Sequence, residues 1–97
     1  MEKIYVGDVG LDVVVDCGCD ISGARETAIL VRRPDGAAVR WAASIYAMNG
    51  EARYLRYATR PGDLSMPGLY KAQAALALGA WSGMGETARF IVRKPFE

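Results

Sequence analysis

A tyrosine placed just after a turn-rich loop constrains this chain more than any other feature. The loop, residues 61–69, contains two Pro-Gly pairs and an aspartate, and Tyr70 follows it at the start of the strand-like segment Lys71–Leu76. In two-sheet antiparallel sandwiches, a tyrosine here tucks under a corner and its hydroxyl binds backbone upstream in the chain. The segment therefore predicts two facing β-layers, with Tyr70 anchoring one bend.

Turn signals divide the chain at short, regular intervals, at Gly7-Asp8, Gly18, Ser22-Gly23, Pro34-Asp35-Gly36, Asn49-Gly50, Pro61-Gly62-Asp63, Pro67-Gly68 and Gly83 to Gly85. Segments of strand length lie between them, a spacing typical of an all-β sandwich or barrel. The predicted strands are Lys3–Val6, Leu11–Asp16, Glu26–Arg33, Ala38–Tyr46, Glu51–Thr59, Leu69–Leu78 and Thr87–Lys94. We therefore predict one all-β domain over residues 1–97, an antiparallel β-sandwich of about seven strands.

Alternation of side chains supports strands rather than helices. Leu11, Val13 and Val15 share one face, and Asp12 and Asp16 share the other. Two turns predict hairpins, because Asn49-Gly50 tolerates the positive φ of a tight primed turn and Pro34-Asp35-Gly36 presets a turn. A helix over residues 72–80 stays an alternative, because this stretch is rich in alanine and leucine.

Residue types that carry common chemistries are few. The chain has no histidine, which removes histidine-based nucleophilic sites and imidazole metal sites. Gly83-Met84-Gly85-Glu86 lacks the spacing and lysine of a phosphate loop and is interpreted as a loop tip. Cys17 and Cys19 are too close for an unstrained disulfide and are expected to be free thiols. We therefore predict a non-enzymatic protein without catalytic residues, cofactor or metal.

One positive signal for binding is arginine interleaved with aromatic residues, and the candidate interaction surface comprises Arg40, Trp41, Arg53, Tyr54 and Arg56. Three interpretations are open. The aromatic residues belong to the core and the arginines snorkel outward, or the set forms a protein interface, or it stacks and neutralises single-stranded nucleic acid. The last is the alternative function, a nucleic-acid-binding β domain.

Charge and hydropathy select no membrane partner. The formal net charge is +1, although residues 1–24 carry five acidic side chains and one basic side chain. No apolar run approaches the roughly 20 residues of a membrane helix, and the first residues lack the pattern of a signal peptide. We therefore expect the chain in the cytoplasm, unless a larger assembly carries it out.

Several motifs together resemble a known family: Asp20–Ala24, Ala28–Gly36, Trp41–Ala43, Gly62–Leu64, Gly68-x-Tyr70-x-x-Gln73-Ala74 and Gly85–Phe90. They are similar to small immunoglobulin-like proteins of tailed phages and prophages, related to the N-terminal domain of the baseplate upper protein. The resemblance implies an immunoglobulin-like fold and a structural or accessory role in the tail or baseplate, in the bacterial cytoplasm or in the virion. It implies contacts with other virion subunits or with copies of itself, through sheet edges and loops. Ala72 stands where antibody-type domains place a cysteine.

Overall fold

The computed structural model describes residues 3–79 and 81–96, except for the side chains of residues 81, 82 and 86. The described residues form eight strands: β1 (Ile4–Tyr5), β2 (Asp12–Asp16), β3 (Arg25–Arg32), β4 (Ala38–Ala42), β5 (Ser44–Met48), β6 (Glu51–Ala58), β7 (Gly68–Leu78) and β8 (Trp81–Arg93). They build a five-stranded sheet of order β1-β8-β7-β3-β4 and a three-stranded sheet of order β2-β6-β5. The predicted all-β class is confirmed, and no helix in this part of the chain is long and apolar enough to cross a membrane.

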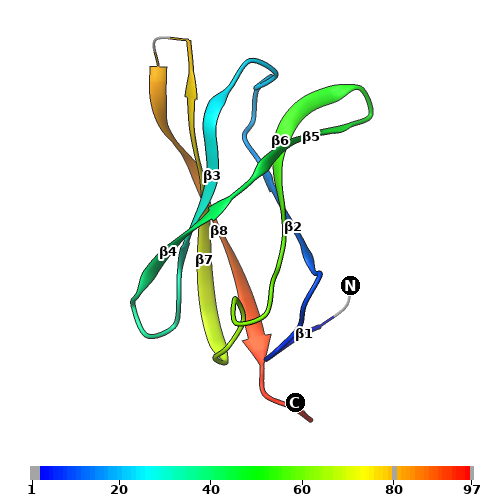
Figure 1. The fold of residues 1–97 in the computed structure, drawn as a ribbon, viewed down its shortest axis with the longest axis vertical. Helices are drawn as coiled ribbons and strands as arrows, with labels where there is room; N and C mark the ends of the chain where they lie inside the picture. Colours follow the sequence, from blue (N-terminus) through cyan, green and yellow to red (C-terminus); the bar gives the residue numbers. More distant parts are fainter. Residues whose placement is uncertain (1–2, 80, 97) are drawn as a thin grey trace.

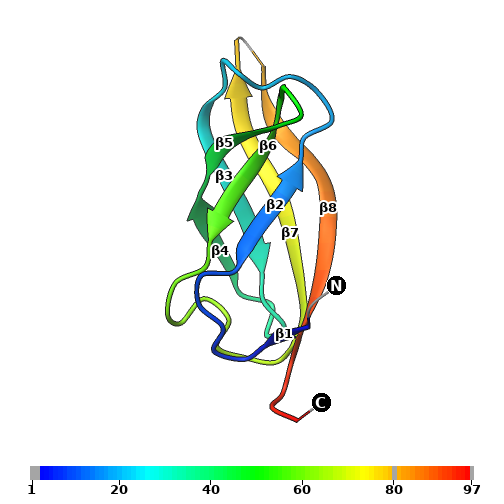
Figure 2. The same ribbon diagram turned by 90° about the vertical axis from the view of Figure 1, so that its right-hand side faces the viewer.

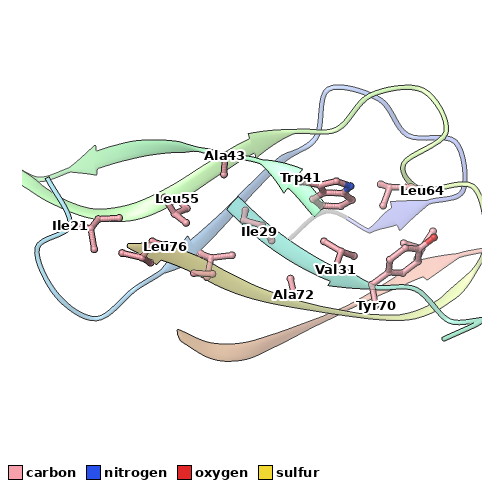
Figure 3. Close-up of a cluster of buried hydrophobic side chains, with 13 residues drawn as sticks. Ile21, Ile29, Val31, Trp41, Ala43, Leu55, Leu64, Tyr70, Ala72 and Leu76 are labelled. Carbon is pink, nitrogen blue, oxygen red and sulfur yellow. The ribbon is translucent and has the colours of Figure 1, made fainter. Parts of the chain in front are cut away.

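The two sheets lie in separate layers (Figures 1 and 2). Buried apolar side chains of both sheets form one cluster. Fully buried side chains come from both layers: Ile29, Val31 and Tyr70 from the larger sheet and Leu55 from the smaller sheet. Figure 3 shows these side chains pointing into the space between the strands. The predicted alternation is confirmed in β2, where Val15 is buried and Asp12 and Asp16 are exposed.

The predicted strand Ala38–Tyr46 is in fact two strands that belong to different sheets. β4 pairs with β3 as far as Ala42, and β5 pairs with β6 from Ser44 onward. Between them, the N–H of Ala43 donates to the carbonyl of Thr27 at 3.3 Å, and the Thr27 hydroxyl donates to the Ala43 carbonyl at 2.7 Å. β3 carries one extra residue relative to β7 between Arg25 and Ala28. Its ladder with β4 ends at this irregularity, at the pair of Ala28 and Ala42, and the chain then crosses to the other sheet.

The predicted loop tip at residues 83–86 is also wrong, because β8 begins at Trp81. Gly83 pairs with Leu76, and Met84 pairs with Ala75. Gly83 and Gly85 lie in a strand, because β8 carries one extra residue relative to β7 between Met84 and Thr87. The Gln73 amide donates to the carbonyl of Gly85 there, at 2.9 Å. Glycine inside a strand commonly marks such an irregularity.

Tyr70 lies where the sequence predicts it. Its side chain is fully buried, and its hydroxyl donates to the carbonyl of Met66 at 2.8 Å. Its ring stacks on Phe90 with centroids 5.2 Å apart. The predicted anchor of the bend is confirmed, and the alternative helix is excluded over residues 72–78, which belong to β7.

Replacing Tyr70 by phenylalanine removes only this hydroxyl. We expect Tyr70→Phe to lower the free energy of unfolding by about 1–3 kcal/mol, because the Met66 carbonyl loses its partner in a part-buried site. Urea denaturation followed by circular dichroism measures the loss. Tyr54→Phe is the matched control and stays within about 0.5 kcal/mol of wild type. Equal values for the two variants would contradict a structural role of the Tyr70 hydroxyl.

Candidate interaction surfaces

The five predicted site residues do not form one surface. Trp41 is 4% exposed, and its ring stacks on Tyr57 with centroids 4.6 Å apart, so it joins the two layers from inside. Arg40 lies next to it in β4, on the larger sheet, and its guanidinium donates to the carbonyl of Glu26 at 3.2 Å. Arg53, Tyr54 and Arg56 all lie in β6 of the smaller sheet. Of the predicted set, only these three lie together.

The predicted hairpin positions the β6 residues. Asn49 and Gly50 have φ values of 53° and 79°, as a tight primed turn requires, and they join β5 to β6. On the other side β6 pairs with β2, where Asp16 lies opposite Tyr54 and Val14 lies opposite Arg56. This pairing brings the acidic N-terminal part of the chain beside the arginines of its middle.

Both β6 arginines bind carboxylates of β2. The Arg53 guanidinium donates to both oxygens of Asp16, at 2.9 and 2.8 Å, and Arg56 donates to Asp12 at 2.9 Å. Arg53 also lies 5.7 Å from the centroid of the Tyr54 ring, and Arg56 lies 5.3 Å from that of Tyr46.

These contacts hold the pKa of Asp16 below its ordinary value and raise the pKa values of both guanidinium groups. The main cause for Asp16 is the hydrogen bond from Arg53, followed by the one from the Gly18 N–H at 2.8 Å. The positive charges of Arg53 and Arg56 on the smaller sheet are therefore neutralised within the protein. A nucleic-acid phosphate would have to displace Asp12 and Asp16, so the face is a poor phosphate-binding surface.

The Asp16 contact predicts an acid-dependent loss of stability. A carboxyl whose pKa is lower in the folded state stabilises the protein above its unfolded pKa of 3.8, and the contribution disappears as the pH falls through the lowered folded value. We expect Asp16→Asn to be less stable than wild type at neutral pH, and the difference in melting temperature to shrink as the pH falls below 3.8. Thermal denaturation over an acidic pH series measures this; a pH-independent difference would contradict it.

A second set of cations lies on the outer face of the larger sheet. Arg32 of β3 is directly opposite Lys71 of β7, and Lys71 is directly opposite Arg89 of β8. We call these three residues the cationic row. All three are exposed, and Arg32 donates to the carbonyl of Gly36 at 3.0 Å. Among the side chains that the structure describes, no ion pair joins the row to a carboxylate.

Apolar side chains flank the cationic row on both sides. Leu69 and Ile91 form a cross-strand pair next to it and are 44% and 56% exposed. On the other side lies a hollow of about 300 Å³, which Arg32 and Lys71 of the row line together with Leu30, Gln73 and Met84. Contiguous exposed apolar side chains rimmed by polar residues are the kind of surface that protein partners cover.

The sequence alone does not reveal the cationic row. Lys71 and Arg89 are recognisable from the alternation of their strands as outward residues, but their alignment depends on the registers of β3, β7 and β8. Arg32 and Arg89 are 57 positions apart in the sequence. Only a charge count on each predicted strand face could have indicated that one face of the larger sheet collects cations.

The two cysteines come directly after β2, which ends at Asp16. Cys17 and Cys19 are both free, and both line an apolar hollow of about 420 Å³ with Ile21, Leu76 and Leu78. Burial and the neighbouring Cys19 and Asp16 raise the pKa of Cys17. The raised pKa favours the protonated thiol, which is less reactive than the thiolate. Within residues 3–79 and 81–96, no three or more His, Cys, Asp or Glu side chains group to hold a metal ion.

No protein-family model matches the chain, and comparisons with curated proteins and with solved structures find no significant match.

Proposed function

We propose that this chain is an immunoglobulin-like sandwich that acts as a non-enzymatic structural or protein-interaction module of a tailed phage or prophage particle. The strand order supports this proposal: β2, β6 and β5 form one layer, and β1, β8, β7, β3 and β4 form the other. Without the edge strands β1 and β4, this order matches the one in which strands B, E and D face strands G, F and C. The motifs around Tyr70 support the relationship to the phage proteins.

One observation carries the interaction role, namely the difference between the two outer faces. The smaller sheet pairs its arginines with its own aspartates at 2.8–2.9 Å. The larger sheet exposes the cationic row beside Leu69 and Ile91. A surface that leaves aligned like charges and aliphatic side chains in water costs stability, which an external partner offsets.

Particle composition tests this function. Prophage induction in the host that encodes the chain, purification of the particles by density gradient and mass spectrometry of their proteins should find the chain at a fixed ratio to tail proteins. The matched control is an abundant cytosolic protein of the same lysate, which should be lost on purification. Recovery of the chain only in the soluble cell fraction would refute the particle role.

A further inference from the structure

We propose that the outer face of the larger sheet binds an acidic protein partner, whose carboxylates lie on the cationic row and whose apolar side chains contact Leu69 and Ile91. This inference rests on the proposed interaction function and adds to it the face and the chemistry of the partner. The face belongs to the central strands β3, β7 and β8, so it is a rigid platform rather than a loop surface.

Charge is the first argument. Neighbouring strands are about 4.8 Å apart, so the row holds three positive side chains across two strand spacings. Like charges directly opposite each other destabilise a sheet. Arg32 donates to a neutral carbonyl, that of Gly36, rather than to a carboxylate. Carboxylates of a partner are the groups that remove this repulsion, as Asp12 and Asp16 do within the smaller sheet.

The side chains around the row favour a protein as the partner. The outward positions next to the row hold Leu69 and Ile91 on one side and Leu30, Gln73 and Thr87 on the other. Single-stranded nucleic acid needs aromatic rings between the cations on which its bases stack. The aliphatic side chains of Leu69, Ile91 and Leu30 instead suit an acidic segment that also carries aliphatic residues.

A second copy of this chain is a poor occupant of the face. A symmetric dimer brings the same patch of both copies together, so each row would lie against an identical row of positive charges. The exposed carboxylates of the smaller sheet, Asp12 and Asp16, already bind Arg56 and Arg53. The geometry therefore favours a different protein over self-association through this face.

Nuclear magnetic resonance titration of the whole chain tests the proposal. The probe is a short peptide that alternates glutamate and leucine, and the control peptide has glutamine in place of glutamate. We expect the acidic peptide to shift the amide signals of Lys71, Gln73 and Arg89, and the glutamine peptide to leave them unchanged. Shifts confined to β6, or equal shifts by both peptides, would overturn the proposal.

Charge-matched variants separate this face from general electrostatic attraction. The double variant Lys71→Gln, Arg89→Gln should raise the Kd for the acidic peptide about tenfold, because it removes favourable charge contacts at the centre of the interface. Arg53→Gln with Arg56→Gln removes the same net charge from the opposite sheet and should change the Kd by no more than about twofold. Equal weakening by both double variants would refute a specific site, as would tighter binding of a thymine oligonucleotide or of anionic lipid vesicles than of the acidic peptide.

Thermal stability gives a readout that needs no ligand. Lys71→Gln removes the middle charge of the row, so its melting temperature should exceed that of wild type at low salt. The difference should shrink near 1 M salt, where the screening length is only about 3 Å. A lower melting temperature of the variant at low salt would overturn the charge argument.

The particle assay and the peptide titration test different claims. If the chain binds the acidic peptide but does not purify with particles, only the proposed particle function is refuted. If the chain purifies with particles but does not bind the acidic peptide, only the proposed binding face is refuted.

Discussion

Replacing Trp41 by alanine should lower the free energy of unfolding by about 3–5 kcal/mol, the cost typical of truncating a large buried aromatic residue. Trp41 is 4% exposed in β4 of the larger sheet, opposite Ile29. Its ring stacks on Tyr57 of the smaller sheet, with planes inclined by 16°. Figure 3 shows the indole ring inside the buried cluster. Loss of the ring therefore removes a contact that joins the two layers as well as apolar burial.

Urea denaturation followed by far-ultraviolet circular dichroism measures this change, with an unchanged slope showing that the unfolding reaction is the same. Trp41→Phe keeps an aromatic ring and should lose less stability than Trp41→Ala. Val14→Ala, on the exposed face of β2, is the control and should change stability little. If Trp41→Ala instead left stability near wild type, the indole would not be part of the core, and its role in a binding surface would be reopened.

Gly68→Ala should destabilise the protein by about 2–5 kcal/mol. Gly68 has a φ of 128°, in the region that favours glycine, and a Cβ atom placed there would lie 2.9 Å from both Cβ and Cγ of Pro34. The left-handed backbone costs about 1–2 kcal/mol for alanine, and forcing a methyl group against a proline ring adds roughly 1–3 kcal/mol. Gly68 precedes Tyr70 by two positions, so the strain falls on the start of β7.

Gly62→Ala separates the two causes. Gly62 has a φ of 89°, but its added Cβ would meet no atom within 4 Å. It should therefore lose only the backbone part, about 1–2 kcal/mol. The same denaturation experiment on both variants measures the difference. Equal losses would contradict the contact with Pro34 and would leave backbone conformation as the whole cause.

Features of the fold that depend on neighbours in the sequence were predicted correctly. The buried and exposed faces of β2 follow from alternation, and the Asn49-Gly50 hairpin follows from the φ values that these two residues tolerate. The burial of Tyr70 and the hydrogen bond from its hydroxyl to the Met66 carbonyl follow from the loop that precedes this tyrosine. Two errors, the crossing at Ala43 and the loop tip predicted at residues 83–86, occur beside positions where a strand carries one extra residue relative to its partner.

The candidate surfaces were predicted less well, because residue type does not say which sheet a strand joins. Arg40 and Trp41 are neighbours in sequence, yet Arg40 is exposed on the larger sheet and Trp41 belongs to the core. In the sequence, the arginines of the cationic row look no different from Arg53 and Arg56, which are neutralised by aspartates. Their difference is the presence of an aspartate on the strand that happens to pair with β6.

The amino-acid sequence by itself determined the strand-forming segments, their inward faces and the bend at Tyr70, because period-two alternation and turn conformations act over a few residues. Tertiary structure alone decided that Asp12 and Asp16 neutralise Arg56 and Arg53. It alone also aligned Arg32, Lys71 and Arg89 across three strands. Those contacts depend on strand order and register, which are fixed by how two sheets pack their apolar faces over the whole domain and not by any local segment.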